Sequence, residues 1–162
     1  MRNRTNKRTL VTFLSLIVLL SLPGWSCDAA EDPIVTIKVE GKFAEVLHNV
    51  RMAIIGKGIN IAHILPASAM LNRTGPEFGY RTPVYADAQT IEFCSARISH
   101  LLARANPDNI VLCPFTISVY VLTAEPNQVR ISYRIPTGKP GSEEAVGEVV
   151  SLIKSILEDA MW

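Results

Sequence analysis

The chain has 162 residues, 48% of them hydrophobic, with 16 Lys and Arg against 15 Asp and Glu, which is the size and composition of one globular domain. Removal of residues 1–29 as a leader would leave 12 basic and 14 acidic side chains, a net charge of −2. Nucleic-acid-binding domains usually carry a basic excess, so this balance argues against a nucleic-acid partner. The remaining 133 residues are enough to bury a hydrophobic core without disulfides.

The N-terminal segment has the three-part pattern of a secretory signal peptide. Basic side chains are concentrated in residues 2–8, an apolar stretch covers residues 10–22, and small residues follow. The apolar stretch is shorter than the roughly 20 residues that a membrane-spanning helix needs. We therefore expect cleavage after Ala29, a single domain in residues 30–162, and a periplasmic or secreted protein. A retained leader, or a lipoprotein acylated at Cys27, are the alternatives that would attach the protein to a membrane.

Hydrophobic periodicity predicts the elements of the first half of this domain. Residues 34–40 alternate as a strand with the odd-numbered side chains inward, and residues 41–55 carry apolar side chains at helical spacing. Residues 59–65 are expected to form a second strand. Residues 66–87 are irregular, and residues 67–71 within them are expected to form one helical turn.

This irregular segment combines aromatic and basic side chains with glycines and prolines. Long loops inside small domains are often functional or mobile. One interpretation is a lid of aromatic side chains packed over a sheet edge. The other is a ligand-binding loop in which Tyr80, Arg81 and Tyr85 contact an anionic or planar molecule.

The second half of the domain is expected to contain three strands and two helices. In chain order, these elements are predicted at residues 89–93, 95–105, 110–122, 128–135 and 143–160. Turn residues separate them at 106–109 and 125–127. The odd-numbered side chains from Phe115 to Val121 are apolar and are expected to face the core, and Ser142 is expected to cap the last helix.

The order of these elements predicts an α+β fold, with a mainly antiparallel sheet and helices packed on one face. The pattern is strand, helix, four strands and helix, with one short extra helix. Consecutive strands in the second half are joined as a hairpin, which is the usual connection of antiparallel neighbours.

The combined pattern resembles the domain-of-unknown-function 302 family. Residues 43–47 followed by Gly58-Ile59 are similar to the opening of that family. The Cys94 segment, the Asn106-Pro107 turn and the run VLCPFTISVYVL at 111–122 are similar to its central signature. The resemblance implies a TATA-binding-protein-like topology and a homodimer, and it implies no agreed activity. In this chain Cys113 precedes its proline, which is the reverse of the common family order.

Two cysteines remain after removal of the leader. Cys94 extends the apolar stripe of the helix that follows it, and Cys113 shares the odd numbering of the inward strand side chains. Both are therefore expected to face the core. In an oxidising compartment such a pair forms a disulfide. The alternatives are two reduced core residues and a thiol–disulfide redox site.

No standard catalytic or metal-binding motif is present in the sequence. There is no Gly-x-Ser-x-Gly, no phosphate-binding glycine loop, and no His-x-x-His or Cys-x-x-Cys pair. Cys94, Cys113 and His63 are weak candidates for a mixed metal site. We predict no catalytic residue and no cofactor. The first hypothesis is a non-enzymatic small-ligand-binding or accessory module, and the competing ones are a redox protein and a structural or interaction domain.

Overall fold

The computed structural model describes residues 33–161, so the predictions for the leader, its cleavage site and Cys27 concern residues outside this range. The elements in chain order are β1 (Ile34–Val39), α1 (Phe43–Gly56), β2 (Ile61–Leu65), α2 (Ala67–Thr74), the 3-10 helix η1 (Gly75–Phe78), β3 (Tyr85–Phe93), α3 (Ala96–Ala105), the 3-10 helix η2 (Pro107–Leu112), β4 (Phe115–Leu122), β5 (Glu125–Arg134) and α4 (Glu143–Ala160).

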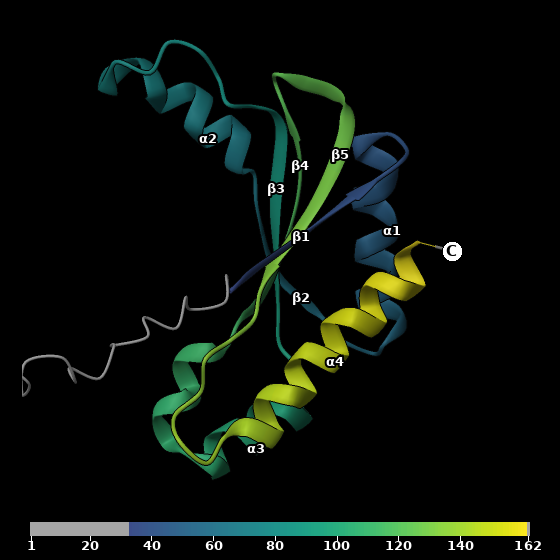
Figure 1. Ribbon diagram of the computed structural model, residues 1–162, viewed down its shortest axis with the longest axis vertical. Helices are drawn as coiled ribbons and strands as arrows, with labels where there is room; N and C mark the ends of the chain where they lie inside the picture. The colour runs from purple at the N-terminus through teal and green to yellow at the C-terminus, as the bar shows by residue number, and fades with distance from the viewer. Residues whose placement is uncertain (1–32, 162) are drawn as a thin grey trace, which may run out of the picture. The chain divides into compact units, whose positions relative to one another are not determined.

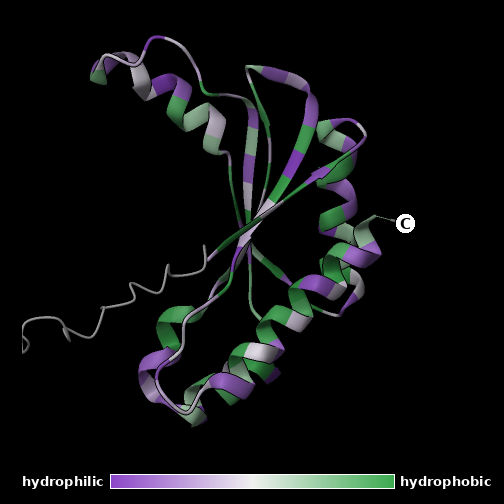
Figure 2. Ribbon diagram, viewed as in Figure 1, coloured by the Kyte–Doolittle hydropathy of each residue, from purple (hydrophilic) through white to green (hydrophobic). Residues whose placement is uncertain are grey.

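The five strands form one antiparallel sheet in the order β1-β5-β4-β3-β2. Hydrophobic and hydrophilic residues alternate along the strands in Figure 2, because successive side chains of a strand point to opposite faces. Ile117, Val119 and Ile131 are at most 1% exposed on the inner face. The predicted α+β class is confirmed, and so is the inward direction of the odd-numbered side chains in β4.

The two long helices cover the inner face of the sheet. Helices α1 and α4 pack against each other, α1 contacts β2, β3 and β4, and buried side chains of both helices share one core cluster with those of the sheet. Both helices lie on the same side of the sheet in Figure 1. Their apolar stripes supply Val50, Ile54, Val149 and Ile153, all at most 1% exposed, to the core. Burial of each such side chain contributes roughly 1.5–3 kcal/mol. This core holds the sheet rigid and leaves its other face available.

Helix α2 departs from the prediction that the helices pack on one face of the sheet. It contacts β3 and lies on the opposite side of the sheet from α1 and α4 in Figure 1. The hydroxyl of Ser68 in α2 donates to the carbonyl oxygen of Ala88 in β3, at 3.4 Å. The single helical turn predicted at 67–71 is in fact an eight-residue helix that continues into η1.

Several strand boundaries differ from the sequence prediction, and β3 begins at Tyr85, inside the segment predicted to be irregular, and not at residue 89. The apolar run 110–112 belongs to η2 and not to the strand, because the Asn106 side chain accepts a hydrogen bond from the backbone N–H of Asp108 and starts that turn. The peptide bond between Cys113 and Pro114 is cis, and β4 begins after it at Phe115. The hairpin turns at residues 123–124, before the predicted 125–127, and Glu125 already pairs with Leu122.

The start of α4 also differs in one detail. Ser142 occupies the N-cap position as predicted, but its hydroxyl caps no helix N–H. It accepts instead from the side-chain amide of Asn109, at 2.7 Å. None of the helices in residues 33–161 combines the length and the apolar character that a transmembrane helix requires.

Candidate functional site

The sheet face opposite α1 and α4 carries a concentration of hydroxyl groups, and we call it the open face. Its side chains come from alternate positions of neighbouring strands, and the register places Ser118 opposite both Thr90 and Ser132. The hydroxyl-bearing residues of the open face are Thr36, Thr90, Thr116, Ser118, Tyr120 and Ser132. The open face is therefore polar because of the same period-two alternation that buries the other face.

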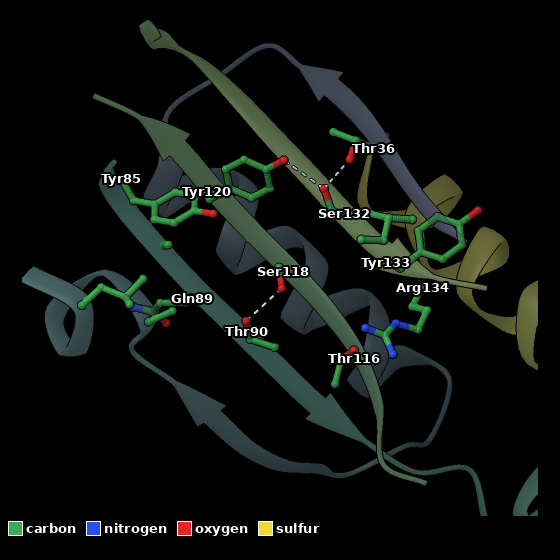
Figure 3. A pocket seen from close by; sticks show the side chains of 14 residues that line it. Thr36, Tyr85, Gln89, Thr90, Thr116, Ser118, Tyr120, Ser132, Tyr133 and Arg134 are labelled. Carbon is green, nitrogen blue, oxygen red and sulfur yellow. Dashed lines mark hydrogen bonds between the residues drawn. The ribbon is translucent and has the colours of Figure 1, made fainter. Parts of the chain in front are cut away.

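Helix α2 and the open face enclose a hollow of about 430 Å³, which we call the sheet groove. Figure 3 shows the side chains that line it, projecting from the strands into the hollow. Ala67 and Leu71 of α2 form an apolar side, together with Tyr85 of β3. The groove thus pairs an apolar wall with a polar floor, as small-molecule sites commonly do.

Hydrogen bonds orient the hydroxyls of the floor. Ser132 shares one with Thr36, at 2.7 Å, and another with the Tyr120 hydroxyl, at 3.0 Å. Thr90 and Ser118 share a third, at 2.8 Å (Figure 3). A hydroxyl donates once and accepts twice. These pairs consequently retain acceptor capacity, and some donor capacity, toward the groove.

A second hollow of about 380 Å³ lies beside the sheet groove, and we call it the loop hollow. It is formed by residues 70–85, and all three predicted ligand contacts, Tyr80, Arg81 and Tyr85, line it. Tyr85 and Leu71 line the sheet groove as well. The Tyr85 ring meets the Tyr120 ring edge to face, with centroids 5.5 Å apart. Tyr85 therefore connects the two hollows.

The predicted aromatic lid over a sheet edge does not form from Phe78 and Tyr80. These two side chains are 72% and 74% exposed. The reason is the tight turn after η1, in which the backbone N–H of Tyr80 donates to the carbonyl of Gly75 at 2.9 Å. A Cβ on Gly75 would lie 2.8 Å from the Tyr80 carbonyl oxygen, so this turn needs glycine there.

At one end of the open face, two basic side chains share one carboxylate. One terminal nitrogen of Arg130 donates to both carboxylate oxygens of Glu125, at 2.8 Å each, and Lys38 lies 3.7 Å from the same carboxylate. The hydrogen bond from Arg130 lowers the pKa of Glu125 below its usual value of 4.5, against an opposing effect of desolvation. The same bond raises the pKa of Arg130.

Arg134 differs from these groups. It lines the sheet groove at the end of β5. Its guanidinium points toward Thr116 in Figure 3. No carboxylate within residues 33–161 forms an ion pair with it.

The structure joins Cys94 and Cys113 in a disulfide, with their Cα atoms 6.2 Å apart. Both residues are half-buried, so neither is fully in the core as predicted. The Ser99 hydroxyl lies 3.6 Å from the Cys113 sulfur. The bridge lies just before α3 and just after η2, and neither cysteine lines the sheet groove or the loop hollow.

The weak metal candidates are not brought together. His63 is an exposed residue of β2 that pairs with Glu92 in β3, while the two cysteines are bonded to each other. Within the described part of the chain, no three His, Cys, Asp or Glu side chains are grouped as a metal site requires.

The family described as "Domain of unknown function DUF302" matches residues 35–160. The chain belongs to this family. The resemblance expected from residues 43–47 and 111–122 is therefore confirmed. A comparison with curated proteins gave no match.

A DUF302 protein of known structure has the same fold. The crystal structure of an uncharacterized conserved protein DUF302 from Bacillus stearothermophilus is similar, with a TM-score of 0.65 and 14% sequence identity. The similarity covers 79% of this chain and 98% of that chain. At this identity the likeness shows the fold alone.

Tyr80, Arg81 and Tyr85, which the sequence suggested as ligand contacts, line the loop hollow, whereas the floor of the sheet groove was not predicted. The polar positions Thr116, Ser118 and Tyr120 were recognisable as the outward side of a strand, which is ordinarily just solvated surface. Arg134 carried no signal beyond its outward position. What makes these side chains part of a groove is α2, which lies across them and is separated from β5 by more than fifty residues in the chain.

Proposed function

We propose that this DUF302 protein is an exported, non-enzymatic module that binds a small ligand in the sheet groove and the adjoining loop hollow. The observation that carries the proposal is the position of Tyr85, which lines both hollows and joins the hydroxyl floor to the loop that holds Tyr80 and Arg81. The sheet groove, at about 430 Å³, lies within the roughly 300–1,000 Å³ of small-molecule sites.

The residues that line the two hollows favour binding over catalysis. Among the residues that the structure describes, no Asp, Glu, His or Cys side chain lines either hollow. General acid–base chemistry most often uses those side chains, and a serine nucleophile needs an adjacent base. Hydroxyl groups, aromatic rings and two guanidinium groups instead supply hydrogen bonds, stacking surfaces and positive charge to a ligand.

The test is a thermal-shift screen of the mature chain, residues 30–162, with sugars, hydroxy acids, aromatic acids and phosphate esters. Tyr85→Ala is expected to weaken binding of every stabilising compound by at least about tenfold, since it removes the shared wall of the two hollows. Tyr85→Phe, which keeps the ring, is the matched control. Circular dichroism checks that both variants are folded. A screen without a stabilising compound, or compounds indifferent to Tyr85→Ala, would refute the proposal.

The exported location rests on the leader pattern in residues 1–29. Expression of the full chain in a Gram-negative host, followed by cell fractionation and mass spectrometry, tests it. We expect a periplasmic or secreted product that begins at Ala30. A membrane-bound product with an acylated Cys27 would support the lipoprotein route, and an uncleaved cytoplasmic product would contradict export.

We also propose a homodimer, following the family resemblance. The outer side of α1 exposes Met52 and Ile55 to 50% and 49%, and a second copy would cover such apolar side chains. Light scattering coupled to size-exclusion chromatography measures the molar mass directly. A monomer at all concentrations would contradict this part of the proposal.

Thiol–disulfide chemistry at Cys94 and Cys113 is the second candidate function. It is favoured by the place of Cys94, directly before the N-cap residue Ser95 of α3, where a helix N-terminus stabilises a thiolate. Mild reductant that releases two reactive thiols, with re-oxidation by an added disulfide, would support it. A bridge that resists mild reductant would leave binding, or a purely structural role, as the function.

A further inference from the structure

Arg134 is the one charged side chain among the described residues that line the sheet groove. The other basic groups of the open face, Lys38 and Arg130, share the carboxylate of Glu125. Arg134 is exposed and has no such partner in residues 33–161. The groove therefore presents one guanidinium group that no carboxylate of residues 33–161 neutralises.

The surroundings of Arg134 are hydroxyls and not carboxylates. Ser132 lies two residues before Arg134 on the same face of β5, and Figure 3 shows the Arg134 guanidinium beside Thr116. Glu92 of the neighbouring strand β3 is paired with Thr116 on the open face, but it is not among the residues that line the groove. A ligand with a negative group at this end of the groove would meet the planar array of N–H donors of the guanidinium. None of the described residues that line the groove would compete for it with a carboxylate.

The number of cations limits the kind of anion. A phosphate dianion is usually held by several basic side chains or by free backbone N–H groups at a loop or helix start. Here the backbone N–H groups of the floor take part in the strand ladders, and one guanidinium remains. A single guanidinium matches a carboxylate, which is planar, carries one charge and accepts two parallel hydrogen bonds.

The other residues that line the groove indicate the chemistry of the rest of the ligand. Pairs of hydroxyls run across the floor, Thr90 with Ser118 and Thr36 with Ser132, and each pair both donates and accepts. Hydroxyl groups of a ligand are the natural partners of such a surface. Leu71 and Tyr85 offer an apolar wall on which the C–H face of a sugar-like ring would pack.

We propose that the sheet groove binds a small polyhydroxylated carboxylic acid, of the uronic or aldonic acid class, with its carboxylate on Arg134 and its hydroxyls on the Ser and Thr side chains of the floor. This inference rests on the proposed binding function, since it assigns the ligand class of the same site. It adds a residue, Arg134, that decides between acidic and neutral ligands.

Calorimetric titration of the mature chain tests the assignment with D-glucuronate and D-glucose, which differ at one carbon, as carboxylate against hydroxymethyl. We expect glucuronate to bind at least tenfold more tightly than glucose, with an affinity that falls as salt is added. Arg134→Gln is expected to abolish this preference, and Arg134→Lys to retain part of it. Arg51→Gln, an equal loss of charge on the exposed side of α1, is expected to change nothing.

Each other outcome has a defined meaning. Equal affinity for glucose and glucuronate, or a preference that survives Arg134→Gln, would overturn the assignment. If glucose 6-phosphate binds more tightly than glucuronate, the ligand is a phosphate and not a carboxylate. If acetate binds as tightly as glucuronate, the groove is a general anion site without selectivity for hydroxyl groups. If glucuronate fails while another compound binds in a Tyr85-dependent manner, the ligand class is wrong and the proposed function stands. If no compound binds, both fall.

Discussion

At the residue scale, Asn109 shows how one polar side chain joins three segments. It is 2% exposed, and its amide nitrogen donates to the Leu102 carbonyl in α3, at 3.0 Å, and to the Ser142 hydroxyl, at 2.7 Å. Its carbonyl oxygen accepts from the backbone N–H of Lys139, at 3.0 Å. The sequence marked 106–109 as a turn, but the partners of Asn109 lie up to 33 residues away.

We expect Asn109→Ala to lower the free energy of unfolding by about 3 kcal/mol, because the Leu102 carbonyl and the Ser142 hydroxyl are left buried without this partner, at a cost of roughly 1–3 kcal/mol each, and the part-buried N–H of Lys139 loses a third hydrogen bond. Urea denaturation measures the loss. Asn106→Ala is the matched control, since it removes only the cap of η2 and should cost about 1 kcal/mol. Equal losses in the two variants would contradict the role given to Asn109.

Glu125 gives a pH-dependent prediction at the same scale. Its pKa is lowered in the folded protein, chiefly by the hydrogen bond from Arg130 and also by the charges of Arg130 and Lys38. A lowered folded pKa means that the pair stabilises the fold above the unfolded-state pKa, near 4.5, and that this contribution is lost as the pH falls through the folded pKa.

We therefore expect Glu125→Gln to unfold more easily than the wild type at about pH 7, and the difference to shrink below the folded pKa as the wild-type carboxylate protonates. Thermal unfolding at a series of pH values measures this difference. Glu40→Gln changes an exposed glutamate that has no ion pair within residues 33–161, and it serves as the control. A difference that stays constant with pH would contradict the assignment.

At the scale of elements, the segment from α3 to β4 is held at both ends. Cys94 precedes α3 and Cys113 follows η2, so the disulfide closes a segment that contains both helices. The sequence predicted that these two cysteines would lie close together, from the periodicity on either side of them. It placed residues 110–112 in the strand instead of η2, because an apolar run has the same appearance in a strand and in a buried turn.

We expect loss of the bridge to lower the free energy of unfolding by about 3 kcal/mol. The bridge joins residues with a sequence separation of 19, and it therefore reduces the conformational entropy of the unfolded chain. Urea denaturation of Cys94→Ala/Cys113→Ala, and of the wild type with reductant, should agree. The double variant itself should be indifferent to reductant. Thiol titration first confirms that reductant has released two free thiols in the wild type. If the urea midpoint of this reduced protein is unchanged, the structural role of the bridge is refuted.

At the scale of the described domain, one face of the sheet is buried and the other is partly open. Helices α1 and α4 bury one face in the core, while α2 lies over part of the other and leaves it open as the sheet groove (Figure 1). This difference is what makes a rigid floor available to a ligand. The stability of the domain and its candidate site thus belong to opposite sides of the same strands.

The sequence by itself determined the α+β class, the inward positions of β4 such as Ile117 and Val119, and the loop that contains Tyr80 and Arg81, while Tyr85, predicted in the same loop, is the first residue of β3. These follow from periodicity and turn chemistry, which act between residues close in the chain. Only the tertiary structure decided that α2 lies across the open face and that Arg134 enters the groove. Both depend on contacts between segments far apart in the chain, which local patterns do not encode.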